Sequence, residues 1–439
     1  MISKKIFILL SLIIPAIFSL FYFLDSKLIE TFTVVYISAS AIFLILCWII
    51  FKIEITNKQL IFFLGIGIAL RIGFVNFTPV GSDDVYRYMW DGRVQDAGIN
   101  PYRYAPIDPA LNFLHTDILP KKLNYIDMKT IYFPLSQWLF YTGYKISGEN
   151  VWGYKLLLLV FEMFTFLSVI LLLKKLKLPL KFILFYVLCP LPIIHFAIDA
   201  HLDGFGLPLL LFAVYFYLSN KRILSYIFLG LSLTIKPIGL LFIPIFFLNE
   251  KGWSNKIKSA VIPLLAFFLQ FIPYIINTNP FEAFIIYSKN WTFNGVVFNI
   301  IDYFMRFNAK TRIVCAVFLG MFLLPLYLSR RDILEKLYYS VILLMIFSPV
   351  VHPWYIAWLV VFLPIIPRWS GIVYAATSCL TAFTILHYQL YGVWNEYPLL
   401  VIFEYLPVII ILILELTENR YHHLKIIPSN NYFISFESE

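Results

Sequence analysis

The sequence predicts an all-α polytopic membrane protein, because both its composition and its apolar pattern exceed what a water-soluble fold can bury. Of the 439 residues, 61% are hydrophobic and 13% are charged, and the mean hydropathy is +0.83. Soluble domains are about half apolar and about a quarter charged. The apolar runs are continuous, whereas a membrane β-barrel would show segments of about ten alternating residues. We therefore expect the bilayer to solvate most of the chain.

Fourteen apolar runs are candidate membrane-spanning helices. Several are shorter than the roughly 20 residues that a helix needs to cross the hydrocarbon layer, so we expect 12–14 spans. We interpret the first run, which follows Lys4 and Lys5, as a retained helix because no clear cleavage site follows it. A single transmembrane domain over residues 1–420 and a short cytoplasmic tail over 421–439 are predicted. The runs cover residues 6–24, 33–51, 59–76, 151–173, 182–198, 204–218, 223–235, 238–248, 259–276, 313–328, 334–349, 353–366, 370–387 and 398–415.

The charge distribution favours a membrane rather than a nucleic acid as partner. A net charge of +9 would suggest nucleic acid in a soluble protein, but here Lys and Arg are concentrated in short loops between apolar runs. That pattern reports orientation in a bilayer. The cysteines each lie inside an apolar run without metal-ligand spacing, so we interpret them as small core residues. They are Cys47, Cys189, Cys315 and Cys379.

Alternate loops carry the basic residues, which orients the protein. If the N-terminus is cytoplasmic, the basic loops on that side include Lys174, Lys175, Arg330 and Arg331, whereas the opposite short loops are poor in Lys and Arg. Residues 77–150 then face outward and form the longest polar stretch, which is too long to be a mere connection. The other unusual polar groups fall on the same side. We therefore expect the functional site on the outer, non-cytoplasmic face.

A helix is predicted near the start of this outer loop. Ser82 or Asp83 can cap it, and Gly98 can stop it. Its apolar stripe contains Tyr86, Met89, Trp90 and Val94, and its charged face contains Asp84, Arg87 and Asp91. Such a helix is expected to lie in the membrane interface with its apolar side down. Anchoring, with the charges simply solvated, is the plainer interpretation.

Asp83 and Asp84 give this helix a second possible role. Like charges close together beside hydrocarbon raise the pKa of at least one carboxyl toward the range of a general base. The helix dipole opposes that rise. Adjacent carboxylates at a helix start therefore favour catalysis over anchoring.

Further polar groups interrupt the apolar pattern at other loop ends. Three ionisable residues at a membrane boundary, Asp199, His201 and Asp203, are costly there and predict function, with a divalent metal site as an alternative. Lys236 can bind an anionic headgroup or merely snorkel. His352, Trp354 and Tyr355 can belong to an aromatic belt or contact a sugar or phosphate. The turns at 98–102 and 131–137 can be ordinary loop punctuation.

These segments together resemble a known family. The strings are SDDVYRYMWDGRVQDAGINPY (82–102), IYFPLSQ (131–137), HLDG (201–204), IKP (235–237) and HPWY (352–355). They resemble the bacterial relatives of polyprenyl-phosphate-mannose-dependent mannosyltransferases in the GT-C glycosyltransferase superfamily, and the acidic loop is similar to GPI mannosyltransferase I. The resemblance covers about residues 80–366. It implies a GT-C-like bundle with an outer active site, although the loop follows the third span instead of the first.

The resemblance implies that a sugar, which we expect to be mannose, moves from a polyprenyl-phosphate donor to an acceptor hydroxyl. Asp83 or Asp84 would be the general base, with Asp83 slightly favoured. Arg87, Arg93 and Lys236 would bind phosphate, and inversion would follow from a single displacement. The other expected substrate-binding residues are Asp91, Tyr102, Tyr132, Gln137, Asp199, His201, Asp203, His352, Trp354 and Tyr355.

No nucleotide-binding glycine motif is present in the sequence, so we expect no cofactor; a divalent metal remains an alternative. The acceptor can be a glycolipid, a polysaccharide or a protein, and the expected location is the bacterial inner membrane. A transporter or flippase of lipid-linked glycans is the main rival. Transporters place ionisable groups near the midplane, whereas these groups gather at one face, which favours an enzyme. A purely structural subunit would leave the paired carboxylates unexplained.

Overall fold

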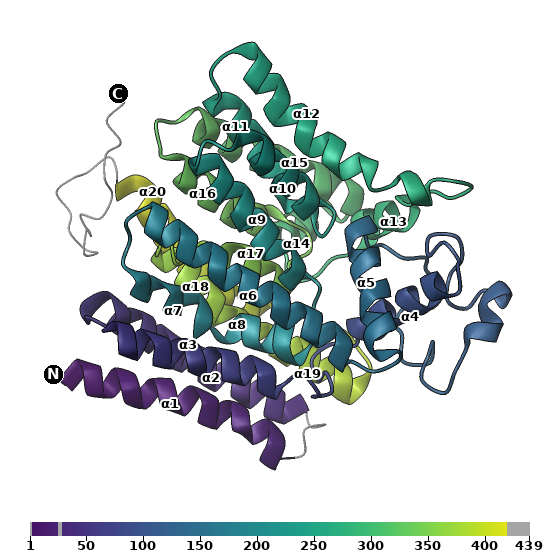
Figure 1. Ribbon diagram of the computed structural model, residues 1–439, viewed down its shortest axis with the longest axis horizontal. Helices are drawn as coiled ribbons and strands as arrows, with labels where there is room; N and C mark the ends of the chain where they lie inside the picture. The colour runs from purple at the N-terminus through teal and green to yellow at the C-terminus, as the bar shows by residue number, and fades with distance from the viewer. Residues whose placement is uncertain (1, 25–28, 419–439) are drawn as a thin grey trace.

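The computed structural model describes residues 2–24 and 29–418, and within these ranges the chain is a helical bundle (Figure 1). Its β-structure, in the part described, is limited to one bridge between Phe293 and Val350. The all-helical prediction is therefore confirmed. The predicted cytoplasmic tail at 421–439 lies outside the described residues.

The first half of the chain crosses the bundle three times before it reaches the outer loop. In Figure 1 this loop, with its two helices, lies at the end of the bundle opposite the start of the first helix. The sixth helix then returns along the bundle. The elements are α1 (Ile2–Phe23), α2 (Ile29–Lys52), α3 (Asn57–Gly73), α4 (Asp84–Asp96), η1 (Pro109–Leu114), α5 (Pro134–Ser147), α6 (Trp152–Lys175), η2 (Leu180–Ile183), α7 (Leu184–Val187), α8 (Pro190–Pro192), the π-helical turn η3 (Ile193–Ile198) and α9 (Asp203–Leu218).

The second half adds further spans and several short helices. Two of the short pieces, Pro237–Leu241 and Pro353–Ile356, begin at prolines, which lack the backbone N–H that a continuous helix would need. The elements are α10 (Arg222–Leu233), η4 (Pro237–Leu241), α11 (Phe242–Asn249), α12 (Trp253–Leu269), η5 (Ile272–Tyr274), α13 (Glu282–Asn290), α14 (Val296–Met305), α15 (Asn308–Leu328), α16 (Ile333–Phe347), η6 (Pro353–Ile356), α17 (Ala357–Val360), α18 (Trp369–Thr377), η7 (Ser378–Thr381), α19 (Ala382–Tyr391) and α20 (Pro398–Glu418).

Fewer helices are long enough to span a membrane than the number of apolar runs suggested. Among the described residues, seven helices pass a test of length and apolar composition, and a bent pair, Leu180–Val187 and Pro190–Ile198, brings the number to eight. The pair bends by 49° at its break. All fourteen predicted runs contain helix, but several are short or broken. The expected 12–14 spans counted those shorter runs as complete crossings.

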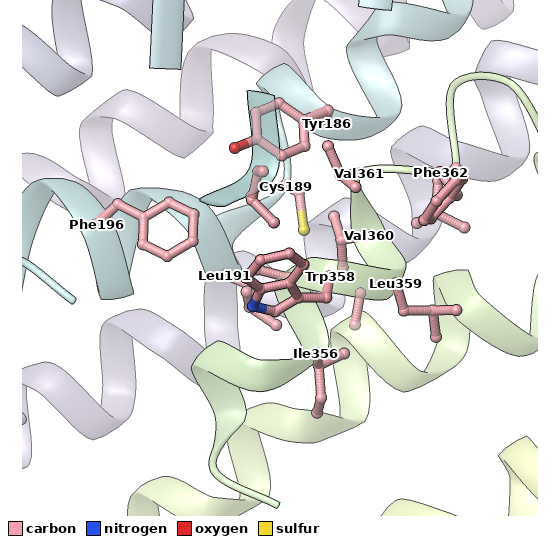
Figure 2. Close-up of a cluster of buried hydrophobic side chains, with 14 of the residues drawn as sticks. Tyr186, Cys189, Leu191, Phe196, Ile356, Trp358, Leu359, Val360, Val361 and Phe362 are labelled. Atoms are coloured by element: carbon pink, nitrogen blue, oxygen red, sulfur yellow. The ribbon is translucent and has the colours of Figure 1, made fainter. Parts of the chain in front are cut away.

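The bundle core packs the broken span against the short helix α17. Figure 2 shows Tyr186, Cys189 and Leu191 of the broken span beside Trp358, whose side chain is fully buried. All four cysteines are free and buried, as the sequence predicted. The Trp358 indole donates a hydrogen bond of 2.6 Å to Asp203 Oδ1 at the start of α9. The core thereby holds a carboxylate that belongs to the polar end of the bundle.

Two polar contacts connect distant helices inside the bundle. Arg71 of α3 and Glu162 of α6 form a buried ion pair of 2.7 Å, which offsets the cost of placing each charge among apolar side chains. Tyr36 of α2 is fully buried and shares a hydrogen bond of 3.0 Å with Ser378 in η7. Helix α2 therefore lies within the bundle and packs against α8, α18 and α19.

Candidate active site

A cavity of about 620 Å³ opens at the end of the bundle that carries α4 and α5. Its walls come from segments far apart in the sequence, and they combine carboxylates, cations and aromatic rings. The lining residues lie within 79–88, 124–133, 202–203, 235–237, 284–293, 352–355 and 385–396. One site is thus assembled from most of the polar loop ends that the sequence placed on one face.

The carboxylate pair lies at the start of α4. Asp83 is the residue before the helix and Asp84 is its first residue, while Ser82 Oγ accepts a hydrogen bond of 3.2 Å from the Asp84 N–H. Asp83 therefore occupies the predicted cap position, although its side chain makes no capping hydrogen bond, and Gly98, with a φ of +73°, follows the helix as predicted. Asn124 donates a hydrogen bond to Asp83 Oδ1. Both carboxylates line the cavity.

Burial changes the acidity of this pair. Burial first, and then the neighbouring Asp84 charge, raise the pKa of Asp83 to about 7. Burial also raises the pKa of Asp84 to about 6, against the attraction of Lys236. The Asp84 side chain is still 33% exposed, because it faces the open cavity. Two carboxyl groups with pKa values near neutral pH therefore face the same cavity.

The α4 helix packs differently from the prediction of a helix lying on lipid. Met89, Trp90 and Val94 of its apolar stripe are buried by the protein itself. Trp90 meets the His115 ring at 5.6 Å between centroids, and the helix packs along α5. The stripe therefore holds α4 within the outer loop, which fixes the direction of its first residues.

Arg87 is held in the cavity wall by its neighbours. Its Nε donates to Asp91 Oδ1 at 3.0 Å, and its Nη2 donates to the Met128 carbonyl at 3.0 Å. Gln137 Nε2 donates to the other oxygen of Asp91 at 3.0 Å. Within the described residues, Arg87 Nη1 makes no hydrogen bond, so this nitrogen is available to a ligand.

Lys236 is the second cation predicted to bind phosphate, and it also lines the cavity. Its ammonium lies 2.6 Å from Asp203 Oδ1 and 3.2 Å from the centroid of the Tyr355 ring. Burial lowers the pKa of Lys236, against the attraction of Asp203. The Tyr355 hydroxyl shares a hydrogen bond of 3.0 Å with Tyr287 of α13. A network of one cation, one carboxylate and two phenols forms this wall.

A column of stacked rings forms another wall. The His352 ring lies 4.4 Å from the Trp354 ring with a 5° angle between planes, and Phe293 stacks on the far side of His352. On its other side, Trp354 stacks on His201. Burial lowers the pKa of His201 to about 3, so this imidazole is neutral. His201 Nδ1 lies 3.4 Å from Asp84 Oδ2.

The structure brings nine predicted site residues to the cavity and places six outside its lining. Those that line it are Asp83, Asp84, Arg87, Tyr132, Asp203, Lys236, His352, Trp354 and Tyr355. Of the other six, Asp91 and Gln137 support Arg87, while the Tyr102 hydroxyl donates to the Tyr132 carbonyl at 2.7 Å. These three are buried supports and not the direct contacts that the sequence suggested.

Arg93, Asp199 and His201 also lie outside the cavity lining. Arg93 pairs with Glu149 and donates to the Tyr144 hydroxyl at 3.2 Å, so its predicted role as a phosphate ligand stays a prediction. Asp199 Oδ1 accepts hydrogen bonds from the Val80 and Gly81 N–H groups at 3.1 and 2.9 Å. His201 lies behind Trp354. Both residues are buried beneath the cavity wall.

The sequence did not identify several residues that complete the cavity. Asn124, Lys129 and Trp291 line it, and Lys129 pairs with Glu282 at 2.9 Å. Tyr388 and Trp394 stack at 4.6 Å between ring centroids near its opening. Apart from Tyr388, which belongs to α19, these residues lie in loops whose local sequence has no distinctive motif. Only the fold shows that they face Asp83 and Asp84.

The predicted metal alternative used Asp199, His201 and Asp203. Asp203 instead forms an ion pair with Lys236 and accepts a hydrogen bond from the Trp358 indole. A different residue, His195 in the π-helical turn, joins Asp199 and His201, and one ligand atom from each lies within 4.8 Å of the others. The sequence signal for His195 was a histidine four residues before an aspartate, inside an apolar run.

Comparisons with known proteins cover most of the chain. Residues 15–250 match the family model described as alpha-(1->6)-mannopyranosyltransferase, N-terminal domain, and residues 292–417 match the one described as MptB C-terminal domain. A search of the curated proteins returned no match. Among solved structures, the chain is similar to ArnT from Cupriavidus metallidurans bound to undecaprenyl phosphate, at 13% identity and a TM-score of 0.47, over 84% of this chain and 73% of that one.

Proposed function

The chain belongs to the alpha-(1->6)-mannopyranosyltransferase family, and on this premise we propose that it moves mannose from a polyprenyl-phosphate donor to an acceptor hydroxyl with inversion. The protein is a multi-pass integral membrane protein of a glycosyltransferase family. The family name supports a mannosyl transfer. The donor, the acceptor hydroxyl and the stereochemistry are inferred from the cavity.

One observation carries the proposal. The cavity holds two carboxyl groups whose pKa values lie near neutral pH, together with cations that a phosphate can reach. Asp83 and Asp84 supply the carboxylates, and Arg87 and Lys236 supply the cations. Departure of a lipid phosphate needs positive charge beside the leaving oxygen, and attack by a hydroxyl needs a proton acceptor. Both requirements are met within one space of about 620 Å³.

Asp83 is the proposed general base. Its pKa of about 7 lies close to the working pH of most cells, where a base is most effective. The acceptor O–H gives its proton to the Asp83 carboxylate as the acceptor oxygen forms a bond to the anomeric carbon. The bond between that carbon and the phosphate oxygen breaks, and the polyprenyl phosphate leaves with the electron pair. This single displacement inverts the anomeric configuration.

Arg87 and Lys236 are the proposed phosphate ligands. Arg87 is oriented by Asp91 and Met128, which leaves Nη1 for a phosphate oxygen. Lys236 is positioned by Asp203 and by the Tyr355 ring. Charge-assisted hydrogen bonds from oriented donors are about twice as strong as neutral ones. A growing negative charge on the leaving phosphate would therefore be stabilised here.

We expect the polyprenyl chain to leave the cavity along an apolar part of its wall. Phe133 and Phe284 line the cavity, and both belong to a small aromatic cluster with Phe267 and Phe271 that is separate from the main core. This cluster connects the cavity with α12, whose residues Leu265 and Phe268 are exposed on the bundle surface. Lipid tails are the expected neighbours of such a surface.

We expect the acceptor to bind at a different, aromatic side of the cavity. Tyr125, Trp291 and Trp394 line the same cavity as Asp83, and Tyr125 and Trp394 are about half exposed. Aromatic faces with hydrogen-bonding edges suit sugar rings, so an acceptor glycan fits this side better than a protein hydroxyl.

We infer that the cavity faces outward from a bacterial inner membrane. The C-terminal ends of α6 and α15 are separated from the cavity by the length of a spanning helix. These ends carry the basic residues Lys174, Lys175, Arg330 and Arg331, in the helix or directly after it. The positive-inside rule puts such ends in the cytoplasm. The transporter alternative gains no support, because the cavity residues gather at one end of the bundle.

The proposal is tested with purified protein in lipid nanodiscs. Polyprenyl-phosphate mannose and a mannose-terminated glycolipid are supplied, and the product is identified by mass spectrometry and by NMR of its linkage. We expect transfer that yields an inverted linkage and stops in Asp83→Asn. Transfer from a nucleotide sugar alone, or a retained configuration, would contradict the proposal.

A further inference from the structure

Three ligand-forming side chains meet behind the cavity wall. His195, Asp199 and His201 each contribute one potential metal-ligand atom, and these atoms lie within 4.8 Å of one another. The exposed fractions of the three side chains are 0%, 1% and 0%. Such burial separates this cluster from the solvated acidic groups that are common on protein surfaces.

The local backbone is folded so that the three side chains converge. His195 lies in the π-helical turn Ile193–Ile198, and the Asp199 N–H donates to the Ile194 carbonyl at 2.9 Å, which closes that turn. Ala200 has a φ of +62°, a conformation that non-glycine residues rarely adopt. The His201 N–H then reaches the His195 carbonyl at 2.8 Å. The two imidazoles therefore lie on one side of a tight reversal.

The ring nitrogens of the cluster lack partners. Within the described residues, His195 Nδ1 and both nitrogens of His201 are buried without a hydrogen bond. Buried polar atoms in native proteins are nearly always satisfied, so each of these needs an unseen partner. Asp199 Oδ1 is engaged by Val80 and Gly81, and His195 Nε2 lies 3.3 Å from the Tyr36 hydroxyl. His201 Nδ1 lies 3.4 Å from Asp84 Oδ2. Within the described residues, His195 Nδ1 and His201 Nε2 are thus the ring nitrogens without a hydrogen bond that remain for an ion.

The spacing fits an ion better than a direct hydrogen bond. His195 Nδ1 and Asp199 Oδ2 are 3.7 Å apart, beyond the roughly 3.2 Å limit of a good hydrogen bond. A tetrahedral ion with bonds of about 2.0–2.2 Å holds its ligand atoms about 3.3–3.6 Å apart. The pair is close to that separation, and the ligand atom of His201 lies within 4.8 Å of both.

We propose that His195, Asp199 and His201 bind one divalent transition-metal ion of the zinc class. Two imidazoles and one carboxylate favour zinc or a neighbouring transition metal over Mg²⁺ or Ca²⁺, which prefer oxygen ligands alone. Three protein ligands leave a coordination position for water. The Tyr36 hydroxyl beside His195 Nε2 supplies the outer contact that orients a metal-bound imidazole.

The ion would fix the segment that carries the carboxylate pair. Asp199 accepts hydrogen bonds from the N–H groups of Val80 and Gly81, the two residues that precede Ser82. His201 contacts the Asp84 carboxylate and stacks on Trp354. Loss of the ion would free the Asp199 and His201 side chains together. The ion therefore has a positioning role, outside the reacting atoms of the proposed transfer.

The test measures metal binding without any sugar, so its outcome is independent of the proposed reaction. Tag-free protein in nanodiscs is treated with a chelator, dialysed and titrated with Zn²⁺, and bound metal is measured by mass spectrometry of the elements. Co²⁺ is then added as a spectroscopic substitute. The variants are His195→Gln and Asp199→Asn, with His352→Gln as the matched control because His352 stacks on Trp354 outside the cluster.

We expect about one Zn²⁺ per chain, visible absorption bands of Co²⁺ bound by nitrogen and oxygen, and at least about 100-fold weaker binding in both ligand variants. His352→Gln should bind as the unaltered protein does. If the unaltered protein binds no stoichiometric Zn²⁺, Co²⁺ or Mn²⁺, or if the ligand variants bind as tightly as the control, the proposal is wrong. Because the titration of the unaltered protein is decisive by itself, a variant that fails to fold leaves the test intact.

Discussion

The Trp354 indole lies face to face on the His201 imidazole, with ring centroids 3.5 Å apart and planes 16° apart. Trp354 lines the cavity, while His201 lies buried behind it. The indole therefore lies between the cavity and the buried His201, and because His352 stacks on it as well, it lines the cavity as part of a column of rings.

Replacing this indole tests the wall directly. Trp354→Ala removes the stacking surface and opens the cavity toward His201, so we expect kcat/KM for sugar transfer to fall about tenfold or more. Trp354→Phe keeps a flat ring and should retain most of the activity. Steady-state kinetics of both variants in nanodiscs checks this. Equal losses in the two variants would show that a flat ring at this position is not what maintains the activity.

Asp83→Asn should abolish most of the chemical step. The amide cannot accept the acceptor proton, so we expect kcat to fall about 10²–10⁴-fold, with the donor KM changed little. Asn124→Ala, which removes only the hydrogen bond to Asp83, is the matched comparison and should cost far less. Near-normal kcat in correctly inserted Asp83→Asn protein would remove Asp83 from the role of base.

The rate should rise with pH through about 7. The pKa of Asp83 is raised to about 7 by burial and by the Asp84 charge, so the carboxylate that accepts a proton is scarce at lower pH. A kcat/KM profile between about pH 5 and 9 would show this ascending limb. In Asp84→Asn the limb should move to lower pH, because the neighbouring negative charge is gone. An unchanged midpoint there would argue against Asp83 as the titrating group.

Lys236→Ala should weaken donor binding and also lower stability. Loss of a charged hydrogen bond to phosphate corresponds to about a 10–100-fold rise in the donor KM. The variant also leaves Asp203, which is 2% exposed, without its ion-pair partner. The double variant Lys236→Met with Asp203→Asn removes both charges, so its thermal unfolding midpoint should recover while donor binding stays weak. Recovery of donor binding in the double variant would contradict a phosphate role.

Gly92→Ala should loosen the outer loop. A Cβ at Gly92 would lie 2.5 Å from the Phe140 carbonyl oxygen and 2.8 Å from Tyr144 Cβ, so α4 would have to move away from α5. We expect a loss of roughly 1–3 kcal/mol, seen as a lower unfolding midpoint in detergent. Gly65→Ala, which meets nothing within 4 Å in α3, is the control and should be neutral or slightly stabilising.

Local patterns predicted the parts of the site that are close together in the sequence. Asp83, Asp84 and Arg87 follow from a capping signal and from helical spacing, and the structure places all three in the cavity. Arg93 belongs to the same helix, yet it pairs with Glu149 about fifty residues away in the loop. Periodicity gives the face of a helix, but not which loop will cover that face.

Long-range folding determined the rest of the site. Lys236 was recognised as a cation interrupting an apolar stretch, but its partners Asp203 and Tyr355 lie in other spans. His195 resembled any polar residue of a buried run until the π-helical turn and Ala200 brought it to His201. Broken helices gave the same difficulty for the number of spans, because hydropathy alone does not show where a proline ends a crossing.

Tyr36 gives helix α2 an importance that its early place in the chain would not suggest. Its hydroxyl meets Ser378 from the last third of the sequence and approaches His195 beside the buried cluster. A hybrid protein built by exchanging the first helices would therefore keep these two contacts only if the new helix also presents a hydroxyl to Ser378 and His195. Any such exchange has to include η7 and the π-helical turn together with α2. The segments that must be exchanged together are therefore far apart in the sequence.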